Sequence, residues 1–330
     1  MSSTFSLPQT QSAITLTEFG ESDVLVYQSD IAVPKLTGSQ VLVKVAYAGI
    51  NPVDYKTRQG LGWGAENIKN NQFARNKPAI LGFDMAGEVV ASEVAEFAVG
   101  DKVAALNFDG SCYAQYNDVD VKYVAKVPEG VDLKTAGALP CAGITAYQML
   151  QFADIEQGEH VVMNAPAGGV GHLAVQMLTR LVDEKNIKLT LICSPEKYQK
   201  LGDLIDTNKL AGWIDYTKDE AFPALEADVL LDLVGGDAGV RALSVLKDEG
   251  RVVVLPSIWV DKLKQAGPDS LIIEGFIAKP NAQDLATVLE QVAQGQLKLH
   301  IQNTYPLADT ATAHQALETG DTFGKIVLEM

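Results

Sequence analysis

The spacing of apolar and polar positions along this chain follows two patterns, and the first pattern gives way to the second near residue 135. In the first part, valine occupies every second position from Val41 to Val45 within VLVKVAYAGI (41–50). This period is typical of a strand with one buried face. Turn signals such as TGS (37–39) separate runs of this kind. The pattern predicts a small β-rich barrel or sandwich.

Beyond residue 135, short apolar runs alternate with stretches of helical spacing. Strands that alternate with helices indicate a parallel sheet with helical crossovers, the doubly wound α/β arrangement. A final strand at 324–330 is expected to return to the first part of the chain. The other elements expected here are strands at 159–164, 188–193, 228–234, 250–256 and 271–277, and helices at 170–184, 195–205, 237–246 and 282–295.

The stretch NAPAGGVG (164–171) lies between an expected strand and an expected helix. Glycines let backbone N–H groups approach a diphosphate closely, and the following helix presents its positive N-terminal end. A glycine-rich loop alone is a weak signal, but a βαβ unit is the setting that a dinucleotide site requires. The alternative is a plain turn with another ligand or none. The residues expected at the diphosphate are Ala167, Gly168, Gly169, Val170 and Gly171.

The end of the second strand indicates which dinucleotide is bound. Sites that select NAD place an acidic residue about 20 residues after the loop, where it holds a ribose hydroxyl. This chain reads CSPEK (193–197) there, without a carboxylate at 192–194. Ser194 and Lys197 suit a 2′-phosphate, and Glu196 is expected to point outward. We therefore predict NADPH; the alternative for Lys197 is an ordinary solvated helix lysine.

Size, charge and cysteine content limit the remaining possibilities. A chain of 330 residues favours two domains. The net charge of −16 argues against nucleic-acid or anionic-membrane partners. No apolar run approaches the roughly 20 residues of a membrane helix, and no secretory signal or transit peptide is visible at the N-terminus. Three scattered cysteines form no disulfide framework, so we expect a cytoplasmic protein.

Several motifs in a fixed order resemble one family over nearly the whole chain. The chain resembles zinc-free members of the medium-chain dehydrogenase/reductase superfamily, in the branch of quinone oxidoreductases and alkenal (enone) reductases. The resemblance implies a GroES-like catalytic domain at 1–136 and 281–330 around a Rossmann domain at 137–280. The matching stretches are AGINPVDYKTRQG (48–60), LGFDMAGEVV (81–90), VGDKVAA (99–105), ALPCAGITAYQML (138–150), NAPAGGVG (164–171), IDYTKD (214–219), DVLLDLVGG (228–236) and GKIVL (324–328).

The resemblance also implies further cofactor contacts. Ser194, Lys197 and Tyr216 match positions at the adenosine 2′-phosphate of NADPH. Lys325, in the returning strand, is expected to approach a cofactor phosphate or to be a surface lysine. The positions that match the nicotinamide side of the cofactor are Thr145, Val234, Leu255, Pro256, Phe276 and Ile277.

Zinc ligands are missing where zinc-dependent relatives carry them. Asn51 stands at the position of the first cysteine ligand, and GFD (82–84) replaces a Gly-His-Glu run. Without a Lewis acid, a conjugated acceptor such as an enone or quinone is the easier hydride acceptor. We expect Asn51 to position the substrate or nicotinamide ribose, with Tyr55 or water giving a hydrogen bond or proton. The alternatives are a turn residue for Asn51 and a core aromatic for Tyr55, while Asp54 and Asp84 are expected to be structural.

Two other functions fit the sequence. The first is an enoyl-thioester reductase, which would use basic residues to hold the substrate arm, and 61–80 is then a loop long enough to act as a lid. The second is a non-catalytic NADPH-binding protein, because a Rossmann fold alone does not prove catalysis. We also expect a homodimer paired through 269–277, since an apolar edge strand left bare is a liability. The basic candidates for the first alternative are Lys56, Arg58, Lys69, Arg75 and Lys77.

Overall fold

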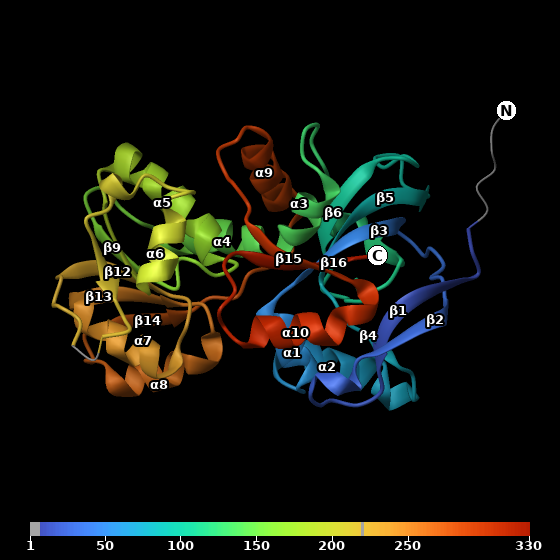
Figure 1. Cartoon of the computed structure of the whole chain (residues 1–330), viewed down its shortest axis with the longest axis horizontal. Coiled ribbons are helices and arrows are strands. Elements are labelled where there is room, and N and C mark those ends of the chain that lie inside the picture. The colour runs from blue at the N-terminus through green and yellow to red at the C-terminus, as the bar shows by residue number, and fades with distance from the viewer. Residues whose placement is uncertain (1–6, 219–220) are drawn as a thin grey trace. The chain divides into compact units, whose positions relative to one another are not determined.

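Residues 7–218 and 221–330 are described by a computed structural model, shown in Figure 1, and they form two compact units. The first unit extends to Cys141 and also includes Pro280–Gln296 and Ile301–Met330. The second consists of Ala142–Lys279 and Leu297–His300. The first unit contains two sheets and the second contains one.

The second unit is built on a six-stranded sheet in which all neighbouring strands are parallel. The strands lie in the order β11-β10-β9-β12-β13-β14. Successive strands from β9 to β11 lie towards one edge of the sheet and those from β12 to β14 towards the other, so the order reverses between β9 and β12. In such sheets, ligands bind outside the carboxyl ends of the strands at the point of reversal. The strands are β9 (His160–Asn164), β10 (Lys188–Cys193), β11 (Gly212–Asp215), β12 (Ala227–Asp232), β13 (Leu246–Val254) and β14 (Ile272–Gly275).

Helices cover both faces of this sheet, with α5 and α6 on one side and α7 and α8 on the other (Figure 1). The apolar stripe of α5 is fully buried, as Leu173 and Leu178 show. On the opposite face, Ala242 and Leu263 pack in one cluster with Leu230. The helices are α4 (Pro140–Ala153), α5 (Gly171–Lys185), α6 (Pro195–Leu201), α7 (Gly236–Ala242) and α8 (Val260–Ala266).

Two sheets form the first unit. The larger follows the order β15-β16-β3-β5-β6-β8, with β7 also paired to β3, and the smaller is β2-β1-β4. Strand β16 pairs antiparallel with β3, placing Ile326 opposite Ile50, so the predicted return of the C-terminal strand is confirmed. The strands are β1 (Thr10–Leu16), β2 (Val26–Ala32), β3 (Gln40–Ile50), β4 (Ala79–Ile80), β5 (Asp84–Ser92), β6 (Lys102–Leu106), β7 (Tyr116–Asp120), β8 (Val124–Lys126), β15 (Ile301–Pro306) and β16 (Lys325–Glu329).

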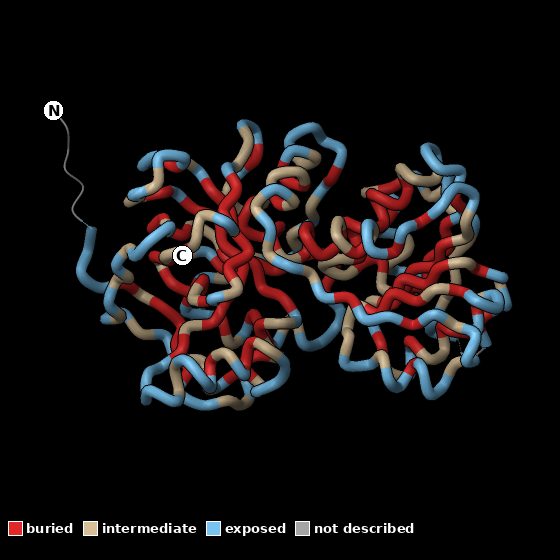
Figure 2. Tube along the Cα trace, turned by 180° about the vertical axis from the view of Figure 1, so that it is seen from behind, coloured by how far each residue is buried: buried red, intermediate tan, exposed pale blue. Residues whose placement is uncertain are grey.

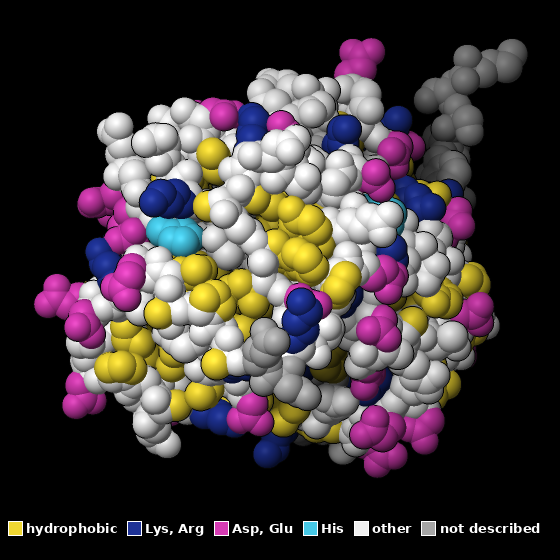
Figure 3. All heavy atoms as spheres, turned by 60° about the vertical axis from the view of Figure 1, so that its left-hand side comes forward, with side chains coloured by type: hydrophobic (Ala, Val, Ile, Leu, Met, Phe, Trp, Pro, Cys, Tyr) yellow, Lys and Arg dark blue, Asp and Glu magenta, His cyan; other side chains and the backbone are white. Residues whose placement is uncertain are grey.

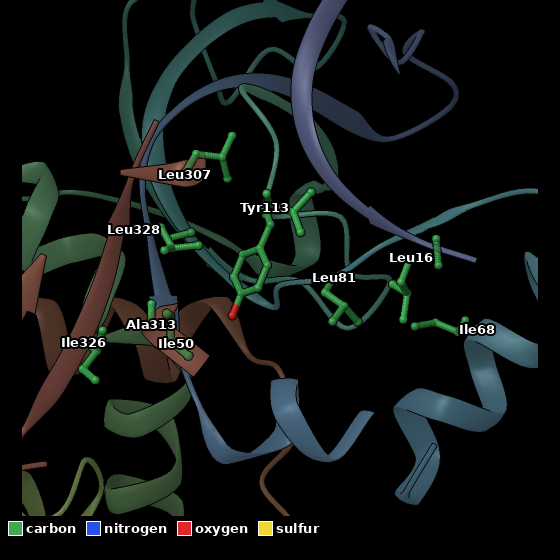
Figure 4. Packing of buried hydrophobic residues seen from close by; sticks show 12 residues of the cluster. Leu16, Ile50, Ile68, Leu81, Tyr113, Leu307, Ala313, Ile326 and Leu328 are labelled. Atoms are coloured by element: carbon green, nitrogen blue, oxygen red, sulfur yellow. The ribbon is translucent and has the colours of Figure 1, made fainter. Parts of the chain in front are cut away.

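The core of the first unit lies between its sheets and helices. Tyr113 is fully buried there, among Leu81, Ile50 and Leu328 (Figure 4). Figure 2 shows the same division in each unit, with buried central strands and exposed connections. The helices of this unit are α1 (Pro52–Arg58), α2 (Gly62–Asn71), α3 (Leu133–Ala138), α9 (Ala282–Ala293) and α10 (Thr310–Glu318).

The α/β fold class and the alternation of strands and helices are confirmed, with differences at some ends. Residues 61–80 are not a long loop, because α2 and a 3-10 turn at Phe73–Arg75 occupy most of them. The helix expected at 195–205 ends at Leu201, with Gly202 as its C-cap. The helix expected at 237–246 ends at Ala242 and continues as a 3-10 turn.

The surface carries acidic, basic and apolar side chains together (Figure 3). Strand β14 is the last strand of the six-stranded sheet, and Ile272 on it is 50% exposed. The homodimer through 269–277 and the cytoplasmic location stay predictions. Among the helices of the described residues, none combines the length and apolar character needed to cross a bilayer.

Candidate functional site

Most residues predicted to contact the dinucleotide gather at one edge of the six-stranded sheet. Because all six strands are parallel, their carboxyl ends meet at this edge. The set comprises the glycine loop after β9, Ser194 and Lys197 after β10, Tyr216 after β11, Val234 after β12, Leu255 and Pro256 after β13, and Phe276 and Ile277 after β14.

The glycine loop is packed tightly against the start of α5. A Cβ on Gly171 would lie 2.1 Å from the Ala165 carbonyl oxygen, whereas one on Gly168 would have that atom at 3.7 Å as its nearest neighbour. The first N–H groups of a helix have no intrahelical acceptor, so the amides of Gly169, Val170 and Gly171 form a suitable anion cradle. The loop therefore has room for a phosphate at Gly168 and none for a side chain at Gly171.

His172 supports this loop from inside the second unit. Its Nε2 accepts a hydrogen bond from the His300 N–H at 3.3 Å, which places the ring proton on Nδ1. Nδ1 then donates to the Gly168 carbonyl oxygen at 2.9 Å. His172 is fully buried and is the second residue of α5, so it is a structural residue at the start of this helix.

A polar pair at the point of strand reversal was missed by the sequence reasoning. Asn164 ends β9 and Asp232 ends β12, and the Asn164 Nδ2 donates to Asp232 Oδ1 at 2.5 Å. The same carboxylate oxygen accepts from the Gly235 N–H at 2.9 Å, so the pair sets the path of the turn that carries Val234. The available signal was a polar residue at the end of each of two otherwise apolar strands.

The region after β10 and β11 is exposed enough to receive a phosphate. Ser194 is the N-cap of α6, and its hydroxyl accepts from the Lys197 N–H at 3.4 Å. Glu196 forms an ion pair with Lys200 at 2.7 Å. This ion pair gives a physical reason for the expectation that Glu196 points away from the cofactor. Tyr216 is 46% exposed, and its carbonyl oxygen accepts from Arg241 at 3.0 Å.

The positions matched to the nicotinamide side differ in exposure. Val234 and Ile277 are exposed, whereas Phe276 is buried and donates its N–H to Val254 at 3.0 Å. Thr145 lies on α4, which precedes β9 in the sequence, so Thr145 does not follow a strand end as the other positions do. Its side chain is only 6% exposed. Trp259 packs on Gly235, where a Cβ would lie 2.1 Å from the indole ring.

In the first unit, Asn51 is the N-cap residue of α1 and lies in a buried polar cluster. Its Nδ2 donates to Asp84 Oδ2 at 2.8 Å, and its Oδ1 accepts from the Lys325 ammonium. Its backbone N–H donates to Asp54 Oδ2 at 2.7 Å, so Asp54 caps the start of α1 and the expectation that it is structural is confirmed. Asp84 Oδ1 accepts from the Cys141 N–H at 2.7 Å. We call Asn51, Asp54, Asp84 and Lys325 the Asn51 cluster.

Burial dominates the protonation of the two carboxyl groups in this cluster. Desolvation, and next the nearby charge of Asp84, raise the pKa of Asp54 to about 7. Desolvation raises the pKa of Asp84 to about 6, against the lowering effect of Lys325. Burial, and next the charge of Glu318, also raise the pKa of Tyr55, which therefore holds its proton more tightly than a free phenol.

Two basic residues lie elsewhere than expected. Lys325 is 2% exposed and donates to the Ile50 carbonyl oxygen at 2.9 Å, so it is not a surface lysine. These contacts favour a role in the Asn51 cluster over the predicted phosphate contact. Arg58 is fully buried and pairs with Glu318 at 2.8 Å, so its inclusion among the basic residues that could hold a thioester arm was wrong. A charged partner on α10 explains why the arginine is buried.

Metal ligands do not gather in the part of the chain that the structure describes. Within residues 7–218 and 221–330, there is no group of three or more His, Cys, Asp or Glu side chains placed to hold an ion. Cys112 and Cys193 are buried thiols, and Cys141 is partly exposed.

Two family models match the chain. A model described as an alcohol dehydrogenase GroES-like domain matches residues 37–157. A second, described as a zinc-binding dehydrogenase, matches residues 209–328. Together they cover parts of both units.

Individual proteins match over nearly the full chain. A 2-methylene-furan-3-one reductase of Solanum lycopersicum is 32% identical, over 99% of this chain and 81% of its own length. An NADPH-dependent alkenal/one oxidoreductase, chloroplastic, of Arabidopsis thaliana is 30% identical, over 98% of this chain and 80% of its own. The solved quinone oxidoreductase of Coxiella burnetii superposes with a TM-score of 0.86 at 32% identity, over 97% and 99% of the two chains.

Proposed function

The chain belongs to the medium-chain dehydrogenase/reductase superfamily, in its zinc-free quinone oxidoreductase and alkenal reductase branch, and from this membership we propose that it is an NADPH-dependent reductase. An oxidoreductase with a Rossmann sheet and a GroES-like domain follows from the family itself. The acceptor that we propose is a quinone or the C=C bond of an α,β-unsaturated carbonyl compound.

One observation carries the cofactor part of this proposal. The glycine loop, the Ser194 to Lys197 turn and Tyr216 follow three neighbouring parallel strands, so they share one edge of the sheet. A diphosphate on the loop amides would direct the adenosine towards β10 and β11. A lysine, a serine hydroxyl and a tyrosine there suit a ribose 2′-phosphate, and no carboxylate ends β10.

The reaction needs few groups from the protein. When bound, the reduced nicotinamide supplies a hydride, which carries two electrons to the β-carbon of the enone. The carbonyl oxygen then carries negative charge until a proton from water reaches the α-carbon, so that one hydride and one proton are added in all. An amide N–H held in place can stabilise that oxygen, and we propose that Asn51 supplies it.

The substrate class is tested with a panel of acceptors. We expect the purified protein to oxidise NADPH with a quinone or a free enone, with and without a metal chelator. We expect Asn51→Ala to lower enone turnover about 100-fold, as the loss of an oxyanion donor does, while NADPH affinity changes little. Asn303→Ala, an exposed asparagine of the same unit, is the control. A preference for crotonyl-CoA would favour the enoyl-thioester alternative, and binding of NADPH without turnover would favour the non-catalytic one.

The cofactor preference is tested at Lys197. We expect Lys197→Ala to weaken NADPH binding about tenfold or more, because a charge-assisted hydrogen bond is lost, and to change NADH binding little. Dissociation constants from fluorescence titration give the comparison. Lys200→Ala is the matched control, since Lys200 lies on the same helix and pairs with Glu196. Equal weakening of both cofactors by Lys197→Ala would contradict the 2′-phosphate assignment.

A further inference from the structure

The Asn51 cluster contains a buried lysine for which the proposed function does not account. Lys325 is the first residue of β16, and its ammonium donates to the Ile50 carbonyl oxygen at 2.9 Å and to Asn51 Oδ1. Asp84 Oδ2 lies 3.7 Å from the same nitrogen. Lys325 is 2% exposed and Asp84 is fully buried. The two charged groups of a desolvated ion pair therefore contact opposite ends of the Asn51 side-chain amide.

The two ions determine the orientation of the amide. An ammonium group only donates hydrogen bonds and a carboxylate only accepts them. The Asn51 Oδ1 therefore faces Lys325, and its Nδ2 donates to Asp84 at 2.8 Å. A rotation of the amide by half a turn would place its two N–H groups against the ammonium and its oxygen against the carboxylate. Only one orientation is satisfied, and it leaves the second Nδ2–H as the remaining donor of the side chain.

Stability alone is a poor explanation for this arrangement. Removing two charges from water is costly, and well-packed apolar residues in place of a buried ion pair are often neutral or stabilising. The ion pair borders the apolar core of the first unit, to which Ile50 and Ile326 belong. A buried ion pair that hydrogen-bonds to both ends of one side-chain amide instead fixes the orientation of that amide.

We propose that Lys325, together with Asp84, is a positioning residue that holds Asn51 with one amide N–H fixed as a hydrogen-bond donor to the carbonyl oxygen of the acceptor. This inference rests on the proposed reductase function and on the role of Asn51 in it. A donor that is already oriented needs no reorganisation when charge develops on the acceptor. Lys325 acts through Asn51 and touches neither substrate nor cofactor.

A double-mutant cycle tests whether Lys325 acts through Asn51. We expect Lys325→Met to lower kcat for an enone about tenfold or more in the wild-type background, by loss of preorganisation, with little change in the NADPH dissociation constant. In the Asn51→Ala background we expect less than about a twofold further loss, since coupled residues are not additive. Losses that multiply would overturn the proposal. Lys44→Met, at an exposed lysine on β3, is the control.

A second readout uses the cofactor-free protein and needs no turnover. The Asn51 side-chain amide resonances are assigned by their disappearance in Asn51→Ala. We expect slow solvent exchange of these protons in the wild type, faster exchange in Lys325→Met, and partial restoration in Lys325→Arg. Exchange that is unchanged in Lys325→Met would overturn the positioning role. If Lys325→Met does not fold, Asp84→Asn takes its place in both experiments.

The two proposals fail in different ways. If the wild type reduces no acceptor, the proposed function fails, and the exchange measurement still decides whether Lys325 orients the Asn51 amide. If the wild type reduces enones and Asn51→Ala retains full turnover, the reductase function stands and the positioning proposal is overturned, because there is then no catalytic donor to position.

Discussion

Replacing Gly171 by alanine is expected to destabilise the second unit and to abolish tight dinucleotide binding. The added Cβ would lie 2.1 Å from the Ala165 carbonyl oxygen and 2.9 Å from two backbone atoms of Pro166. Backbone atoms cannot rotate away, so the start of α5 must separate from the loop after β9. Since Leu173 and Ala174 in the same first turn of α5 are fully buried, this movement disturbs the core as well. We expect a loss of about 1–3 kcal/mol in the free energy of unfolding, as for other overpacked sites.

The same loop provides the control for this variant. In Gly168→Ala the new Cβ would meet only the Ala165 oxygen at 3.7 Å, an ordinary contact. We expect Gly168→Ala to keep the stability of the wild type in urea unfolding and to weaken NADPH binding if the diphosphate approaches that glycine. Gly171→Ala should lose both properties. A Gly171→Ala protein with wild-type stability and NADPH affinity would show that close packing of α5 on the loop is not required.

The sheet edge where we propose that the dinucleotide binds was predictable from the sequence because its signals are local. The strand, the glycine loop and the helix of residues 159–184 follow each other directly, and parallel strands bring their carboxyl ends together whatever the details of packing. Ser194 and Lys197 could therefore be placed near the loop before the strand order was known. Their position relative to a bound phosphate depends on side-chain conformations, which no sequence pattern describes.

The Asn51 cluster was not predictable in the same way. Asn51, Asp84 and Lys325 come from α1, β5 and β16, and only the pairing of β16 with β3 brings Lys325 beside Asn51. Charged residues are rarely buried in full unless they are paired. Lys325, which precedes three consecutive apolar residues, was therefore expected at the surface or at a phosphate. Arg58 was misplaced for the same reason, because its partner Glu318 lies on α10.

Replacing Asp54 by asparagine is expected to change how the stability of the protein depends on pH. Asp54 is fully buried, and burial together with the charge of Asp84 raises its pKa from 3.8 to about 7. Between about pH 4 and pH 7 the folded protein holds a proton on Asp54 that the unfolded chain has lost, so the free energy of unfolding falls as the pH rises through this window. Asparagine has no such proton to lose, and its carbonyl oxygen can still accept the Asn51 N–H.

The difference in the free energy of unfolding between Asp54→Asn and the wild type isolates the ionisation of Asp54. We expect the stability of Asp54→Asn relative to the wild type to rise by up to about 1 kcal/mol per pH unit between pH 4 and pH 7, measured by urea unfolding at several pH values. The charges around the carboxyl group, Asp84 and Lys325, are present in both proteins. Asp30→Asn, at an exposed position on β2, should give a flat difference. A flat difference for Asp54→Asn as well would mean that Asp54 ionises as readily in the folded protein as in the unfolded chain, and that the Asn51 cluster carries two full carboxylate charges against a single lysine.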